Sequence, residues 1–130
     1  MRRSSTLPNY RVIGSVLDRA AIILGWLPAA WLVALMTLAL RARVHLGHWP
    51  RPYRPDPKDL PFAWHYIFVE KGMFVVLAGV GAMVAFALLA RRFVSAHVYR
   101  RSLIAFALGW ALIVVMLSVP PIDFVNWFLD

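Results

Sequence analysis

Residues 20–40 read AAIILGWLPAAWLVALMTLAL, and this stretch carries no charged side chain between Arg19 and Arg41. As an α-helix it would be about 31 Å long, which matches the ~30 Å hydrocarbon thickness of a bilayer. Pro28 removes one backbone hydrogen bond and is expected to bend this helix, which membrane helices tolerate. The stretch is too long for the apolar region of a signal peptide, and no small-residue cleavage site follows it. We therefore expect a retained transmembrane helix.

Two further apolar runs follow, at about 70–90 and 103–119, each bounded by charged residues or prolines. After them, residues 122–130 place their polar side chains on one helical face, as in a short segment lying at a membrane surface. The alternative is a frayed tail anchored by its aromatic side chains. The sequence thus predicts an all-α integral membrane protein forming a single domain over residues 1–130. It has three transmembrane helices, a proline-rich interfacial loop over 41–66, and a short amphipathic C-terminal segment.

Composition excludes several classes of protein. Hydrophobic residues make up 62% of the 130 residues, whereas a soluble domain is nearer half apolar. The chain has no cysteine, so disulfides, thiolate metal sites and cysteine nucleophiles are excluded. The net charge of +8 does not indicate a nucleic-acid partner, because the basic residues lie at the ends of the apolar runs, where they meet head groups.

Lysine and arginine counts set the expected orientation. Eight basic residues fall in the N-terminal segment and the second loop, against six in the first loop and none in the C-terminal tail. The positive-inside rule favours a cytoplasmic N-terminus and a C-terminus outside. Arginine far outnumbers lysine and alanine is abundant, which indicates a GC-rich bacterial genome and hence a multi-pass protein of the inner membrane.

Small residues recur at helical spacing within each apolar run. In lipid, such residues mark the faces where helices approach closely, because the hydrophobic effect does not drive helices together there. No ionisable residue lies inside the runs once their ends are excluded, which argues against a proton or ion path within one copy. The expected packing residues are Ala21, Gly25, Ala29, Gly72, Gly79, Gly81, Ala85, Ala105 and Gly109.

Proline dominates the first loop, where five of the nine prolines lie. Each fixes its own φ and biases the preceding residue towards extended backbone. We expect a stiff loop without a helix of its own, lying on the membrane with its aromatic rings, Tyr66 included, at head-group level. Arginines among these rings have the geometry to bind lipid phosphate. The residues expected to contact lipid or a partner are Arg41, Arg43, Trp49, Arg51, Tyr53, Arg54 and Trp64.

Histidines and carboxylates also gather in this loop, and together they are candidate ligands for a divalent metal. The chain lacks a paired motif such as His-Glu-x-x-His, and the ligands would come from a proline-stiffened segment. We therefore predict no metal, no cofactor and no catalytic residue, with the histidines bonded to the loop or to head groups. The candidate ligands considered are His45, His48, Asp56, Asp59 and His65.

The loop string GHWPRPYRPDPK over 47–58 resembles a segment of uncharacterised small bacterial multi-pass membrane proteins. The resemblance covers about a dozen residues and implies no activity. The function expected from the residues is therefore that of a non-catalytic accessory or structural subunit, or an assembly factor, of a larger membrane complex. Its partners would be membrane lipids and other membrane subunits or further copies of itself. The alternatives are a protein or enzyme that binds a lipid phosphate or polyprenyl carrier through the 41–66 loop, and a small oligomeric transporter.

Overall fold

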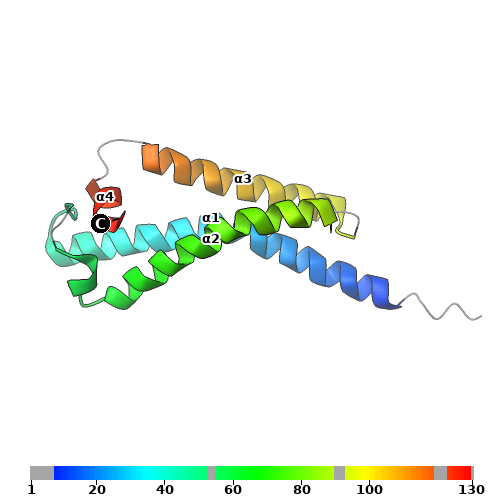
Figure 1. Cartoon of the computed structure of the whole chain (residues 1–130), viewed down its shortest axis with the longest axis horizontal. Coiled ribbons are helices and arrows are strands. Elements are labelled where there is room, and N and C mark those ends of the chain that lie inside the picture. Colours follow the sequence, from blue (N-terminus) through cyan, green and yellow to red (C-terminus); the bar gives the residue numbers. More distant parts are fainter. Residues whose placement is uncertain (1–7, 53–54, 90–92, 119–122, 130) are drawn as a thin grey trace, which may run out of the picture.

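The computed structural model describes residues 8–52, 55–89, 93–118 and 123–129. These parts form an all-α chain without a strand, in the order α1 (Pro8–Leu46), η1 (Pro57–Asp59), α2 (Ala63–Leu89), α3 (Ala96–Ser118) and α4 (Asp123–Leu129). Figure 1 shows α1, α2 and α3 as three long helices with α4 folded back at one end. Tyr53 and Arg54, two of the expected contact residues, lie outside the described residues.

Three helices are long and apolar enough to cross a membrane, which confirms the predicted fold class. The 39 residues of α1 rise about 58 Å, far more than the ~30 Å of hydrocarbon, so both of its ends extend beyond the apolar layer. Large apolar side chains such as Phe74, Leu88 and Val115 are exposed on the outer faces of α2 and α3. In lipid, this apolar exterior needs no covering by protein.

The helices reach into the first loop from both sides. α1 continues through Arg41 and Arg43 to Leu46. It ends at Gly47, whose φ of 74° lies in the left-handed region that glycine adopts without strain, and whose N–H donates to the Arg43 carbonyl at 2.9 Å. α2 begins at Ala63, well before the charged pair that opens the expected second run.

The remaining loop does contain a helix, contrary to the sequence prediction. η1 is a single 3₁₀ turn that begins with Pro57, a residue suited to a first helical position because its missing N–H is not needed there. The Asp56 carboxylate caps it by accepting a hydrogen bond from the Lys58 N–H at 2.8 Å. A proline-rich segment can therefore form a turn when a carboxylate stands immediately before it.

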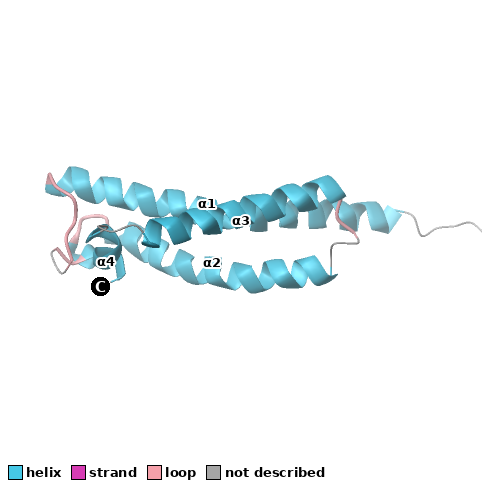
Figure 2. Cartoon of the chain, turned by 90° about the horizontal axis from the view of Figure 1, so that it is seen from above, coloured by secondary structure: helices cyan, strands magenta, loops and turns pink. Residues whose placement is uncertain are grey.

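α1 is the central helix and packs against both α2 and α3, whereas α2 and α3 make few direct contacts. α3 runs parallel to α1: Ser95, just before α3, bonds Asp18, and further along Gly109 lies against Pro28. α2 runs antiparallel to both. Figure 2 shows α3 lying along α1; α2 also packs against α1, through fewer contacts. The three helices thus form an open arrangement and not a closed bundle.

A compact apolar core lies at the loop end of the molecule. Here α4 packs into the angle between α1, the loop and α2, and Trp127 becomes fully buried. The Trp127 indole N–H donates to the Pro55 carbonyl at 2.6 Å, which ties α4 to the loop. The core is formed by Leu35, Leu38, Ala39, Ala42, Leu60, Phe62, Tyr66, Val69, Trp127 and Phe128.

Candidate functional site

Arg41 is the organising cation at the loop end. Its guanidinium lies 4.8 Å from the centre of the Phe62 ring and 5.4 Å from that of Trp64, both within range of a cation–π interaction. Its Nη1 also lies 3.4 Å from Nδ1 of His65, a buried histidine at the start of α2. Because arginine can only donate, Nδ1 must be the accepting nitrogen, which places the proton of the neutral ring on Nε2.

A second arginine–aromatic pair stands apart from the first. The Arg43 guanidinium lies 4.6 Å from the centre of the Trp49 ring, and both residues are exposed. Arg51 is exposed as well. The structure therefore divides the expected contact residues into two ring-stacked pairs, Arg41 with Trp64 and Arg43 with Trp49.

Tyr66 does not lie among the exposed rings, so the expectation that its ring faces the head groups is wrong. It is only 5% exposed, and its ring centre lies 5.5 Å from that of Phe128. The physical reason is that α4 covers this part of α2. The sequence predicts that residues 122–130 lie at a membrane surface, and no local pattern marks Trp127 or Phe128 as core residues.

The histidines of the loop are not brought together. His45 packs edge-on against Phe62 at 5.8 Å, His48 donates from Nδ1 to the Trp49 carbonyl at 2.8 Å, and His65 lies beside Arg41. Asp56 is engaged in capping η1. Within the described residues, no three histidine, aspartate or glutamate side chains form a group suited to a metal ion.

Glycines mark the points where α1 approaches its neighbours most closely. A Cβ at Gly25 would lie 2.7 Å from the Ser102 carbonyl oxygen, and one at Gly109 would lie 2.9 Å from Pro28 Cβ. On α2, Cβ atoms at Gly72 and Gly79 would each meet an α1 side chain at 2.9 Å. Gly81 differs, since no described atom lies within 4 Å of its Cβ position. Ala21 is buried, Ala29 and Ala105 are half-buried, and Ala85 is exposed.

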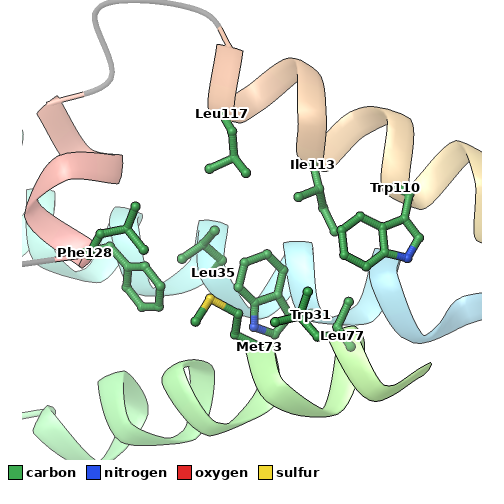
Figure 3. A pocket seen from close by; sticks show the side chains of 10 residues that line it. Trp31, Leu35, Met73, Leu77, Trp110, Ile113, Leu117 and Phe128 are labelled. Carbon is green, nitrogen blue, oxygen red and sulfur yellow. The ribbon is translucent and has the colours of Figure 1, made fainter. Parts of the chain in front are cut away.

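An apolar groove opens between α2 and α3, with α1 as its floor; we call it the α2–α3 groove. It encloses a cavity of about 140 Å³ whose walls expose only apolar surface. Figure 3 shows its side chains converging from all four helices, with Phe128 closing one end. The labelled ones are Trp31, Leu35, Met73, Leu77, Trp110, Ile113, Leu117 and Phe128.

Two polar groups lie in or beside this groove. Trp31 spans from α1 to α2, where its indole N–H donates to the Val69 carbonyl at 2.8 Å. The indole N–H of Trp110 is buried and has no acceptor among the described residues. The described residues that line the groove expose no acid, base or nucleophile into it.

The fold, the three apolar helices and the exposed apolar exterior define a multi-pass integral membrane protein. Comparison with known proteins adds no closer relationship: no family model, no curated protein and no solved structure matches the chain.

Proposed function

We propose that this chain is a non-catalytic subunit or assembly factor that docks onto another membrane protein through the α2–α3 groove and the adjoining flank of α2. The observation that carries the proposal is the open, wholly apolar groove between two helices that make few contacts with each other. The occupant proposed is an apolar transmembrane helix of a partner.

The flank of α2 beside the groove has the features of a helix-packing face. Gly81 lies one helical turn beyond Leu77, which lines the groove, and Ala85 lies one turn further. Gly25, Gly72, Gly79 and Gly109 are used for close approach inside the chain, but Gly81 is not. Small residues at four-residue spacing let two backbones come close enough for van der Waals contact, which drives association in lipid. Gly81 and Ala85 therefore offer a partner helix a place to pack.

The cellular setting is part of the same proposal. The excess of lysine and arginine on the N-terminal side supports an inner-membrane subunit with its N-terminus in the cytoplasm and its C-terminus outside. In that orientation the loop, η1 and α4 face outward, and the two arginine–aromatic pairs stand at the outer surface.

Site-specific photo-crosslinking tests the docking. A crosslinker at Leu77, in the groove, should give one discrete adduct in membranes, while a crosslinker at Val115, on the side of α3 away from this groove, should not. Gly81→Leu should abolish the Leu77 adduct. Ala82→Leu is the matched control, because adjacent residues point about 100° apart on a helix.

The adduct also identifies the partner. An added mass of 14.8 kDa would indicate a second copy of this chain, and any other mass a different subunit. Equal adducts from Leu77 and Val115, or the absence of an adduct at both positions, would refute the proposal.

A further inference from the structure

A second groove runs along the other side of α3, between α3 and α1; we call it the α1–α3 groove. It encloses about 680 Å³ and is mostly apolar. Trp26 and Ala29 line it from α1, and Ile104, Leu108 and Leu112 line it from α3. Trp26 is 61% exposed, so its indole stands at the edge of the groove instead of filling it. The groove is distinct from the surface proposed for partner docking.

The charge along this groove is distributed unevenly. His97 and Arg101 line the end where α3 begins, one helical turn apart. On α1, Arg19 precedes Ile22 and Trp26 by three and seven residues, so it lies on the same helical face one turn before the groove residues. All three basic side chains are exposed. The start of α3 adds the positive end of its helix dipole to this region.

One carboxylate, that of Asp18, lies at this end and offsets part of its positive charge. Asp18 accepts hydrogen bonds from both the N–H and the hydroxyl of Ser95, each at 3.0 Å. This contact directs the Asp18 carboxylate to the beginning of α3. Arg19 and Arg101 outweigh this carboxylate, so the mouth of the groove, which His97 also lines, keeps a net positive charge. The rest of the groove is mostly apolar.

The dimensions of the groove match one leaflet of a bilayer. From Arg101 to Leu112 the helix rises about 17 Å, close to half of the ~30 Å hydrocarbon thickness. With the basic residues at head-group depth, the apolar part would reach the middle of the membrane. An anionic phospholipid has this same division, with a phosphate at one end and an acyl chain of leaflet length below it.

We infer that the α1–α3 groove binds one anionic phospholipid. Its phosphate lies between His97 and Arg101, which line the groove, and Arg19, one helical turn before it, with an acyl chain beside Trp26 and Leu108. An apolar helix would fill the groove but leave the net positive charge of Arg19 and Arg101 at its mouth unmatched. Free phosphate would meet the charges but leave the groove empty. A phospholipid satisfies both, since arginine forms paired hydrogen bonds with phosphate.

Native mass spectrometry of the full chain in mild detergent tests this inference, with phosphatidylglycerol and phosphatidylcholine as probes. One phosphatidylglycerol should remain bound under conditions that strip phosphatidylcholine. Arg101→Gln should weaken that binding at least about tenfold, because a charged hydrogen-bonded contact is lost. Arg100→Gln removes the same charge from the adjacent residue, which does not line the groove, and should retain the lipid.

The acyl-chain half of the site has its own variant pair. Leu108→Trp narrows the groove and should reduce retention of phosphatidylglycerol, whereas Leu103→Trp makes the same change outside it. Thermal melting of each variant in phosphatidylcholine shows whether the fold is intact. Inorganic phosphate at equal concentration should neither bind stably nor compete with the lipid.

Three results would overturn the inference. They are equal retention of the two lipids, equal weakening by Arg100→Gln and Arg101→Gln, and displacement of the lipid by inorganic phosphate. The first two results would mean that lipid retention does not depend on the basic residues of the groove. The third would mean that the apolar groove does not contribute to lipid binding.

Discussion

At the scale of single residues, the contact between α1 and α3 depends on the absence of side chains. Gly25 brings the α1 backbone against Ser102, where a Cβ would lie 2.7 Å from a carbonyl oxygen and 2.8 Å from Cα. Backbone atoms cannot move aside as a flexible side chain can, so any residue larger than glycine must separate the two helices. Gly81 carries no such constraint, because its Cβ position is open.

Gly25→Ala is therefore expected to destabilise the protein by about 1–3 kcal/mol, the range for overpacking a tight contact. Gly81→Ala should be neutral or slightly stabilising, since alanine favours a helix over glycine by about 1 kcal/mol. Thermal melting of both variants in the same detergent, followed by size-exclusion chromatography, measures the difference. Equal melting temperatures for the two variants would show that α1 and α3 are not in backbone contact at Gly25.

At the scale of elements, α4 and the first loop stabilise each other. α4 has only seven residues, and an isolated helix of that length is not stable in water. Its position depends on burial of Trp127 and Phe128 and on the hydrogen bond to the Pro55 carbonyl. In return, α4 covers Tyr66 and closes one end of the α2–α3 groove. The loop is held in place by helix packing as well as by its prolines.

Trp127→Ala should therefore loosen both elements, with a loss of about 3–5 kcal/mol, the usual result of removing a buried aromatic side chain. Trp127→Phe keeps most of the packing and removes the hydrogen bond to Pro55, which contributes about 1 kcal/mol. Hydrogen–deuterium exchange over residues 55–66 measures the effect, and exchange should be fastest in the alanine variant.

Asn126→Ala is the matched control for this experiment, because Asn126 is the exposed neighbour on the same helix. It should leave exchange over the loop unchanged. If Trp127→Ala also left loop exchange unchanged, α4 would not contribute to the order of the loop.

At the scale of the whole molecule, local pattern predicts the helices but not their partners. The apolar runs are enough to place three helices, because bilayer thickness fixes the length of a span. Small residues occur in every run, and nothing local separates Gly25 and Gly109, which are packed, from Gly81, which is open. In the same way, residue type makes Arg41 a candidate contact residue. Its stacking on Phe62 depends on α1 and α2 meeting at the loop end, a contact between residues far apart in sequence.

The length of α1 allows the orientation of the chain in the membrane to be tested. Because α1 is longer than the apolar layer, residues near its two ends should be in water on opposite sides of the membrane. Ser15 and Val44 are exposed at those ends, and Ala30 is exposed near the middle. The chain contains no cysteine, so Ser15→Cys, Val44→Cys or Ala30→Cys would each introduce a unique thiol.

Labelling of each thiol with a membrane-impermeant maleimide then shows on which side of the membrane that residue lies. With a cytoplasmic N-terminus, Val44→Cys should react in intact cells and Ser15→Cys only after the membrane is opened. Ala30→Cys should react in neither case, because its thiol would lie within lipid. The reverse pattern at the two ends would show that the orientation is inverted, and it would remain consistent with three membrane-spanning helices. Ready labelling of Ala30→Cys in intact cells would instead mean that the middle of α1 is in water, and the assignment of α1 as a spanning helix would fail.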